Sequence, residues 1–420
     1  MILQNIKNYL KKLTFTRGNP EISQTREVLP SPIREVSTKP MTDSFACPYC
    51  ASKDFFRRGF RQKTMEQVQL YQCKSCGKTF TPHATKGKHY PLATIFDAIS
   101  LYNLGYSLEE TCRIIQNREG QSQRAGNNET GIGASTLSNW LRETVDLCRF
   151  SRMREFAVKK YSPKEMVITA TLAHRQLYRF RFHQAKAELM INEEFQHRKF
   201  TPLKEFLEMV PVECPHQYFQ EGLRASETPL TFSKTAMIVR GKQNYATKTA
   251  QFVLQSVKER HDRHETLQKF MLYNDSVTVA TEVPVYLTRD DMEHMRTQLG
   301  FELFGEMPKL ITGHIDILQI RNGQIHILDY KPNAEKERPI EQLTLYAMAL
   351  SRLTGLRLFE FKCAWFDEKD YFEFYPLHVL HKPKKAVRRR KISTQEGTYL
   401  VNKEINKIKN IRPTPYEISN

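Results

Sequence analysis

Apolar and polar residues alternate along two neighbouring runs of the chain, ITGHIDILQI and QIHILDY, which predicts a β-hairpin. Asn322 and Gly323 lie between the runs, and Asn-Gly in this position is the strongest short signal for a tight two-residue turn. The turn sets the register, so Arg321 should pair with Gln324. A second hairpin is predicted further along, where FEFKCAWF and YFEFYPL flank the polar stretch DEKD.

Residues 91–147 repeat apolar positions at helical spacing, and a polar, glycine-rich stretch at 120–131 interrupts the pattern. Gly105 breaks the first helix, and Ser107 is placed to cap the second helix ahead of Glu110. With the run that follows the interruption, this segment predicts three helices.

The third of these helices should have Ser135 or Thr136 as its cap and should turn Trp140 and Leu141 inward. Two stretches of the region 165–230, HRQLYRFRFHQAKAELMI and PLKEFLEMVPVECPHQYF, are also predicted to be helical. They are basic and aromatic without a catalytic motif. We expect them to bridge two domains or to extend a helical layer.

The composition is that of a globular protein, because 40% of the 420 residues are hydrophobic and 26% are charged. A chain of this length corresponds to about two or three domains. No apolar run approaches the roughly 18 to 20 residues that cross a bilayer. The start MILQNIKNYLKKL places lysines among its apolar residues, so we expect no signal peptide and no membrane partner. The expected location is the cytoplasm and nucleoid, or the nucleus if the host is eukaryotic.

Basic residues outnumber acidic ones, with 64 Lys and Arg against 46 Asp and Glu, a formal net charge of +18. Residues 51–100 contribute +6 of this excess and residues 382–420 contribute +8. Concentrated basic charge favours a nucleic acid or an acidic membrane surface as partner, and simple solubility is the alternative. The run HKPKKAVRRRK, with seven basic residues in eleven, is typical of an electrostatic arm that binds phosphate.

Four of the eight cysteines form two Cys-x-x-Cys pairs, Cys47/Cys50 in CPYC and Cys73/Cys76 in CKSC, separated by residues 51–72. Two such pairs at this spacing indicate a tetrahedral zinc site with four thiolate ligands. The stretches FFRRGF and VQLYQC should form a β-ribbon that brings the pairs together. Without a secretory signal we predict no disulfides. The remaining thiols are expected to be structural: Cys112, Cys148, Cys214 and Cys363.

The segment CPYCAS…QLYQCKSCGKTF resembles the zinc-ribbon head of insertion-sequence transposases, and the following helices resemble the helix-turn-helix of the same proteins. In that family the ribbon binds DNA, and the last helix would read the major groove. The interruption at 120–131 is longer than the usual turn of the motif, so an ordinary three-helix packing domain is one alternative. A solvated ribbon face is the other. The resemblance implies phosphate contacts by Arg57, Arg58, Arg61, Lys63, Lys74 and Lys78, and groove contacts by Ser135, Thr136, Ser138, Asn139 or Arg142.

The register of the first hairpin places Asp316 directly opposite Asp329, with Cβ atoms roughly 5 Å apart. Lys331 lies two residues after Asp329 and therefore on the same face. Two acids in this position repel each other unless a divalent cation neutralises them, and oxygen ligands suit Mg²⁺ or Mn²⁺. Lys331 would hold or deprotonate a water molecule that such a cation activates for attack on a phosphodiester. The opposite face should be core, with Ile315, Ile317, Leu328 and Tyr330.

The pattern Asp316–x12–Asp329–x–Lys331 resembles the PD-(D/E)XK nuclease superfamily. Downstream, IEQLTLYAMAL places Gln342 and Tyr346 one helical turn apart, which resembles the QxxxY motif of the RecB-like branch and implies that the pair positions the active site and DNA. The resemblance covers about residues 235–378.

Three further positions bear on this resemblance. TEVPVYL resembles the strand before the first aspartate, which makes Glu282 a candidate third acid. The branch often has a histidine four residues after a glycine on its first helix, but here Tyr245 follows Gly241 at that spacing. His314 shares the face of Asp316 and is interpreted as a lining residue. The scattered cysteines do not match the iron–sulfur cluster of some members.

We therefore expect a multidomain protein with a small zinc β-ribbon, a helical helix-turn-helix-like domain and an α/β restriction-endonuclease-like core, in which helices flank a mixed sheet. The expected function is that of a DNA-binding, metal-dependent nuclease. A non-catalytic DNA-binding regulator with a vestigial nuclease fold and a mobile-element recombination protein are the alternatives. RNA remains an alternative substrate, and the sequence predicts no oligomeric state. The expected divisions are a basic helix and linker (1–45), the ribbon (46–85), the helical domain (90–148), the nuclease-like domain (165–380) and a basic tail (381–420).

Overall fold

The structure is a computed structural model of the chain. It describes residues 46–47, 49–62, 67–81, 90–122, 132–193, 197–232, 239–242, 244–257 and 259–381, and three strands within 390–410. The predicted helix at 1–13, the linker at 14–45 and most of the basic run after His381 lie outside the described residues.

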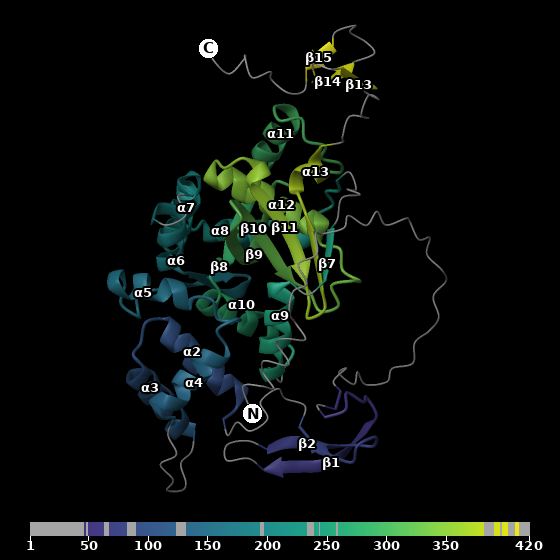
Figure 1. Cartoon of the computed structure of the whole chain (residues 1–420). Coiled ribbons are helices and arrows are strands. Elements are labelled where there is room, and N and C mark those ends of the chain that lie inside the picture. The colour runs from purple at the N-terminus through teal and green to yellow at the C-terminus, as the bar shows by residue number, and fades with distance from the viewer. Residues whose placement is uncertain are drawn as a thin grey trace.

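A nine-stranded mixed sheet forms the centre of the protein (Figure 1). Its strand order is β4-β5-β8-β9-β10-β11-β12-β7, and β6 pairs with β9 outside this path. The pairs β10–β11 and β6–β9 are parallel, and the other pairs are antiparallel. The strands are β4 (Ile168–His174), β5 (Gln176–Phe182), β6 (Leu223–Arg224), β7 (Val239–Lys242), β8 (Thr278–Thr288), β9 (Leu310–Arg321), β10 (Gln324–Tyr330), β11 (Phe361–Phe366) and β12 (Asp370–Phe374).

Both predicted hairpins are confirmed. Strands β9 and β10 pair with Arg321 opposite Gln324. The two turn residues, Asn322 and Gly323, have φ angles of 52° and 70°, which the two-residue turn requires and which asparagine and glycine tolerate best. Strands β11 and β12 form the second, antiparallel hairpin.

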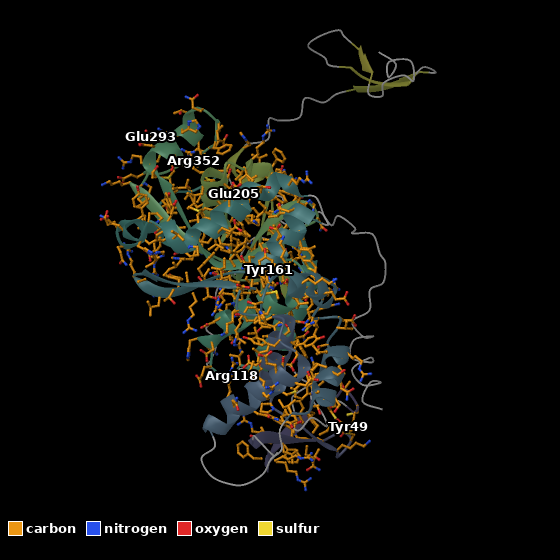
Figure 2. All side chains as sticks on the ribbon, turned by 90° about the vertical axis from the view of Figure 1, so that its left-hand side faces the viewer. Tyr49, Arg118, Tyr161, Glu205, Glu293 and Arg352 are labelled. Carbon is orange, nitrogen blue, oxygen red and sulfur yellow. The ribbon has the colours of Figure 1, made fainter. Side chains whose placement is uncertain are left out.

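Helices cover both faces of the sheet and bury two apolar clusters. On one face α12 connects β10 to the parallel strand β11 and packs over the central strands, together with α6, α7, α11 and α13 (Figure 1). The other face carries α9 and α10. Arg352 of α12 forms an ion pair with Asp291 of α11 at 2.6 Å. Figure 2 labels Arg352 near Glu293, which is also a residue of α11. These helices are α5 (Ser151–Lys160), α6 (Gln184–Glu188), α7 (Thr201–Glu213), α8 (His216–Glu221), α9 (Tyr245–Val253), α10 (Asp262–Asn274), α11 (Arg289–Thr297), α12 (Ile340–Thr354) and α13 (Pro376–Leu380), with short 3₁₀ or π turns at Leu189–Glu193, Arg198–Phe200, Ala225–Glu227, Leu254–Ser256 and Leu358–Glu360.

The helix predicted across HRQLYRFRF is wrong, because Gln176–Phe182 of this stretch form the strand β5, which pairs with β4 along its whole length. Aromatic residues alternate there with arginines, and Phe180 and Phe182 are fully buried. Alternation with a period of two fits a strand whose one face is covered. The remainder of the predicted helix is helical as α6, and PLKEFLEMVPVECPHQYF forms α7 and α8 as predicted.

Three helices form in the segment after residue 90, namely α2 (Leu92–Asn103), α3 (Leu108–Ser122) and α4 (Ala134–Glu143). The hydroxyl of Ser107 accepts a hydrogen bond from the Glu110 amide at 3.0 Å, so the predicted cap of α3 is confirmed. The predicted cap of α4 is wrong: the cap residue is Gly133, two or three residues earlier, and no side chain caps the helix. Trp140 is buried as predicted, whereas Leu141 is only partly buried.

These three helices share a core with the helices on the second face of the sheet. The ring of Phe96 on α2 lies 4.9 Å from that of Phe252 and 5.2 Å from that of Phe270, centroid to centroid. The Asn103 amide donates to Asn274 of α10 at 2.8 Å, and both side chains are buried. The helical segment is therefore packed against α10 by apolar and polar contacts together.

Two smaller antiparallel sheets complete the described chain. The first consists of β1 (Phe55–Gln62), β2 (Gln67–Cys73) and β3 (Thr79–Phe80), and it confirms the predicted β-ribbon. The second, β13 (Arg390–Thr394), β14 (Gly397–Val401) and β15 (Ile408–Asn410), lies in the tail and was not predicted. Among the described residues, no helix has the length and apolarity needed to span a membrane.

We expect Phe96→Ala to destabilise the whole protein. The substitution removes a buried ring between α2, α9 and α10, and loss of such a ring costs about 3–5 kcal/mol. Because the helical segment and the sheet share this cluster, the melting temperature of both should fall together in thermal unfolding followed by circular dichroism.

The matched control is Phe56→Ala on β1, whose ring is 46% exposed and should change stability by less than about 0.5 kcal/mol. Separate unfolding of the helices in Phe96→Ala, with the sheet unchanged, would contradict the shared core.

Candidate functional site

Asp316 and Asp329 lie side by side on β9 and β10. The ladder is in register up to Leu328 opposite Ile317, and the next pair in that register is Asp329 opposite Asp316. Their carboxyl groups are hydrogen-bonded to each other. The structure thus brings together the two acids that the hairpin register predicts.

Lys331 directly follows β10 and contacts this pair. Its Nζ lies 3.0 Å from Oδ2 of Asp329, and the Asp329 side chain is only 4% exposed. Burial alone would lower the pKa of Lys331, but the Asp329 carboxylate outweighs burial and raises the pKa above its usual value. The lysine is therefore an ammonium ion at neutral pH.

Glu282 adds a third acid on the other side of Asp316. On β8 and β9, Thr281 pairs with Ile317 and Val283 pairs with Ile315. Glu282 and Asp316 lie between these pairs and therefore occupy facing positions. Glu282 has a φ of 52°, which is strained for a residue with a side chain. Glu282, Asp316 and Asp329 consequently form one row across β8, β9 and β10, which we call the acidic row.

The electrostatics of the acidic row show the cost of placing three acids together. Burial and the charge of Asp316 raise the pKa of Glu282 to about 8. Burial and Asp316 also raise the pKa of Asp329 well above its usual value. Burial acts in the same direction on Asp316, but hydrogen bonds with His264 and Asp329 outweigh it and lower the pKa of Asp316. With a pKa of about 8, Glu282 keeps a proton at neutral pH that a bound cation would displace.

The chemistry of the row fits a hard divalent cation. Oδ2 of Asp329 is buried, and the Lys331 ammonium lies 3.0 Å from it. A buried carboxylate oxygen is costly unless a cation or a proton compensates it. Carboxylate oxygens in a row, with the 21% exposed Asp316 side chain open to water, are the donors that Mg²⁺ and Mn²⁺ use.

Helix α10 supplies two residues of the site that sequence reasoning missed. Nδ1 of His264 lies 3.4 Å from Oδ2 of Asp316. One turn later, the Gln268 amide donates to Oε1 of Glu282 at 2.7 Å. The signal available in the sequence was a polar pair four residues apart, with Gln268 at a position otherwise suited to the core. Tyr245 lies at the position where the RecB-like branch often has a histidine. Its hydroxyl donates a hydrogen bond to the carbonyl of Leu147.

Gln342 and Tyr346 lie together on α12, and the Gln342 amide donates to the Tyr346 hydroxyl at 2.9 Å. The Tyr346 ring packs on the backbone of Gly313 in β9, where an added Cβ would come within 2.2 Å of the ring. Burial raises the pKa of Tyr346, so the phenol stays neutral. His314, one residue after this glycine, is 9% exposed and bonds to His174 at 2.8 Å.

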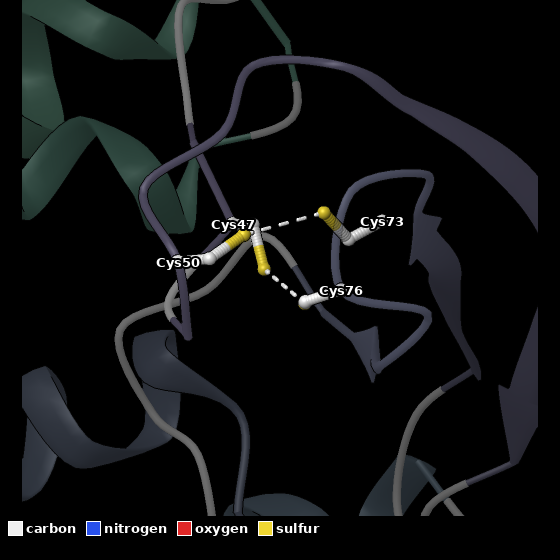
Figure 3. Close-up of side chains that lie close together, drawn as sticks. All are labelled: Cys47, Cys50, Cys73 and Cys76. Atoms are coloured by element: carbon white, nitrogen blue, oxygen red, sulfur yellow. Dashed lines mark hydrogen bonds between the residues drawn. The ribbon is translucent and has the colours of Figure 1, made fainter.

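The four cysteines of the two knuckles converge in the β1–β3 sheet (Figure 3). Sγ of Cys47 lies 3.6 Å from that of Cys76, and Sγ of Cys50 lies 3.5 Å from that of Cys73. Four thiolates around zinc, with Zn–S bonds of about 2.3 Å, lie about 3.8 Å apart. The four-cysteine cluster therefore has the size of a zinc site.

The two knuckles have the same backbone pattern. The Cys47 amide donates to the Ser52 carbonyl and the Cys73 amide to the Lys78 carbonyl, at 2.8 and 3.0 Å. Each knuckle ends in a left-handed residue, Ala51 with φ 59° and Gly77 with φ 67°. This repeated turn explains why each pair of sulfurs points to a common centre. All eight cysteines are free thiols, and the structure contains no disulfide among them.

The candidate nucleic-acid contacts are placed as follows. Arg57, Arg58 and Arg61 are exposed on β1, Lys74 forms an ion pair with Asp54 at 3.0 Å, and Lys78 lies over the Tyr49 ring. On α4, the exposed residues Ser135, Asn139 and Arg142 follow helical spacing, whereas Thr136 and Ser138 are half-buried. Lys63 lies outside the described residues.

Comparison with known proteins identifies the superfamily of one part of the chain. Residues 212–412 match the family model of the PD-(D/E)XK nuclease superfamily. This part of the chain is a PD-(D/E)XK nuclease superfamily domain, and the acidic row, Lys331, α10 and α12 all lie within it. Searches of curated proteins and of solved structures found no match.

We expect Glu282→Gln to stabilise the metal-free protein at high pH. The folded-state pKa of about 8 lies above the unfolded value of about 4.5. The stability that the protonated acid contributes is thus complete below about pH 4.5 and lost as the pH rises through about 8. Thermal unfolding in magnesium-free buffer should show equal melting temperatures near pH 5, and an advantage of at least about 2–4 °C for Glu282→Gln above pH 8.

The control is Glu293→Gln, which changes an exposed acid of α11. A pH-independent difference between Glu282→Gln and the unaltered protein would contradict the proposed origin of the effect.

Proposed function

We propose that this protein is a Mg²⁺- or Mn²⁺-dependent deoxyribonuclease of RecB-like type, which hydrolyses phosphodiester bonds. The observation that carries the proposal is the acidic row with Lys331 beside it, inside a PD-(D/E)XK nuclease superfamily domain. A superfamily of nucleases uses acids and a lysine for metal-assisted hydrolysis, and these residues have the corresponding chemistry.

Asp316 and Asp329 would hold the metal ion, with Glu282 and His264 as further ligands. The facing positions of the three carboxyl groups and the raised pKa values of Glu282 and Asp329 support this assignment. A bound Mg²⁺ or Mn²⁺ polarises the phosphodiester and lowers the pKa of a coordinated water.

The protein's own residues have separate tasks in this proposal. Lys331 is positively charged and orients the attacking water while it offsets the negative charge that develops on the phosphate. Gln342 and Tyr346 present one hydrogen-bonded pair of polar groups above β9, which positions the substrate backbone. Gln268 fixes the orientation of Glu282 through its hydrogen bond.

The zinc ribbon and α4 would bring DNA to the nuclease domain. The exposed arginines of β1 and the exposed polar residues of α4 are suited to phosphate and base contacts, respectively. This part of the proposal rests on charge, exposure and the resemblance to transposase heads.

Three single substitutions test the proposed catalysis: Asp316→Ala, Asp329→Ala and Lys331→Ala. Each should reduce cleavage of end-labelled linear and of circular DNA with Mg²⁺ by at least about a hundredfold, because each removes a metal ligand or the neighbouring cation. DNA binding, measured by mobility shift with Ca²⁺ in place of Mg²⁺, should persist.

Asp290→Ala, at an exposed aspartate of α11, is the matched control and should cleave normally. Full cleavage by Asp329→Ala would exclude the proposed site. DNA binding without cleavage by the unaltered protein under any divalent ion would favour the vestigial regulator, and strand joining in a transfer assay would favour the recombination protein. Cleavage of RNA in preference to DNA would revise the substrate.

The packing of Tyr346 on Gly313 gives a further prediction. In Gly313→Ala the new methyl group would lie 2.2 Å from the Tyr346 ring, so the ring must move and its bond with Gln342 must weaken. Cleavage should fall by about tenfold or more, and stability should fall by about 1–3 kcal/mol from overpacking.

The control is Gly133→Ala, where the new methyl group meets only the Ser135 hydroxyl at 3.8 Å. It should leave cleavage intact. Normal activity of Gly313→Ala would mean that the position of Tyr346 does not matter for catalysis.

A further inference from the structure

A second group of metal-binding side chains lies outside the acidic row. His174 ends β4, Cys214 follows the last residue of α7, and His216 begins α8. One ring nitrogen from each histidine and the Cys214 sulfur lie within 4.8 Å of one another. We call these three residues the thiol–imidazole cluster.

Both partners in the cluster approach the same atom of His174. Nδ1 of His216 lies 2.8 Å from Nε2 of His174, and Sγ of Cys214 lies 3.8 Å from that nitrogen. A ring nitrogen has one proton or one lone pair, so it serves one hydrogen-bond partner at a time. Here a second nitrogen, from His216, and the Cys214 sulfur both lie close to Nε2 of His174. A cation bound by all three atoms would account for this arrangement.

The backbone between Cys214 and His216 holds these two side chains together. The His216 amide donates to the Cys214 carbonyl at 2.9 Å, and Pro215 restricts the intervening residue. Ligands two residues apart in a fixed turn lose little conformational freedom on binding, which favours a metal site.

The orientation of His174 is fixed from its other side. Its Nδ1 lies 2.8 Å from Nε2 of His314, and its ring stacks on Phe219 at 4.0 Å with an interplanar angle of 8°. The His314 ring in turn stacks on Tyr178 at 3.6 Å. A metal-bound histidine ordinarily gives its second ring N–H to such a partner, which sets its tautomer.

We propose that His174, Cys214 and His216 bind a zinc ion. Two imidazoles and a thiolate are the donor set of zinc, with bonds of about 2.0–2.3 Å, and not that of Mg²⁺, which takes oxygen ligands. Ligand atoms in such a site lie about 3.3–3.6 Å apart, so small side-chain movements from the present distances suffice. His174 is buried and His216 is exposed, which leaves the ion a route from solvent and a fourth position for water.

This site does not depend on the proposed nuclease activity. Its ligands differ chemically from the acidic row, so Mg²⁺ that fills the row would not fill the cluster. The two are physically connected, because His314 stands on β9 two residues before Asp316. Zinc bound to His174 would hold His314, and through it the start of the catalytic part of β9.

Zinc content of the purified, tag-free full chain tests the proposal. Dialysis against zinc and then against metal-free buffer, followed by elemental analysis, should give two zinc ions per chain, one in the four-cysteine cluster and one here. Cys214→Ser and His216→Gln should each retain one. Cys73→Ser should also retain one, and the double substitution Cys73→Ser/Cys214→Ser should retain none.

His378→Gln, at an exposed histidine of α13, is the matched control and should keep both ions. Because His216 is exposed, His216→Gln tests the site even if Cys214→Ser fails to fold, and circular dichroism verifies each fold. One zinc ion in the unaltered protein, or two in both Cys214→Ser and His216→Gln, would overturn the proposal and leave a hydrogen-bonded chain of histidines.

Cobalt gives a second readout that is independent of cleavage. In a Cys47→Ser/Cys73→Ser background, where the ribbon site is removed, Co²⁺ should produce the thiolate charge-transfer and tetrahedral bands of a single-cysteine site. Adding Cys214→Ser should abolish the charge-transfer band, whereas adding His378→Gln should preserve it. Unchanged spectra after Cys214→Ser would exclude the thiolate as a ligand.

Discussion

Repulsion among three carboxyl groups in one row of the sheet is the constraint around which this site is built. Glu282, Asp316 and Asp329 occupy neighbouring positions on β8, β9 and β10, where a sheet normally places apolar or opposite-charge pairs. The surroundings reduce the cost with an amide from Gln268, a histidine and a lysine ammonium, yet two of the acids keep raised pKa values. Binding of a cation would remove this remaining cost, so the stability of the fold and the proposed metal binding depend on the same three carboxyl groups.

Helix α10 connects this constraint to the N-terminal helices. His264 and Gln268 reach the acids, whereas Phe270 and Asn274, further along the helix, pack against α2. Helix α10 thus contacts both the acidic row and α2, and the candidate DNA-reading helix α4 packs on α2 within the same apolar cluster.

Sequence patterns predicted the parts of the site that depend on local geometry. The Asn322-Gly323 turn fixes the register of β9 and β10, and with it the meeting of Asp316 and Asp329. His264 and Gln268 reach the acids only because of the way α10 packs on the sheet. The spacing of residues within the helix does not predict that packing. The sequence predicts a helix where β5 lies, because arginines and aromatic residues occur in both helices and strands. The pairing with β4 and the burial of Phe180 and Phe182 favour the strand, and both depend on the rest of the fold. The thiol–imidazole cluster is formed by residues that lie far apart in the sequence or at the ends of different elements. The sequence around Cys214 therefore indicates only a structural thiol.

Ligand chemistry distinguishes three candidate metal-binding sets along this chain. The four cysteines of the ribbon have the donor set of a closed zinc site, and zinc there would stabilise a sheet too small to have a sizeable core. The carboxyl groups of the acidic row suit a hard ion, which would keep a coordinated water for the proposed hydrolysis. The thiol–imidazole cluster lies between these cases, with a soft donor, two imidazoles and one open position. His314 contacts His174 and lies two residues before Asp316 on β9, so an ion in the cluster would fix the position of β9 without competing for the oxygen ligands of the row.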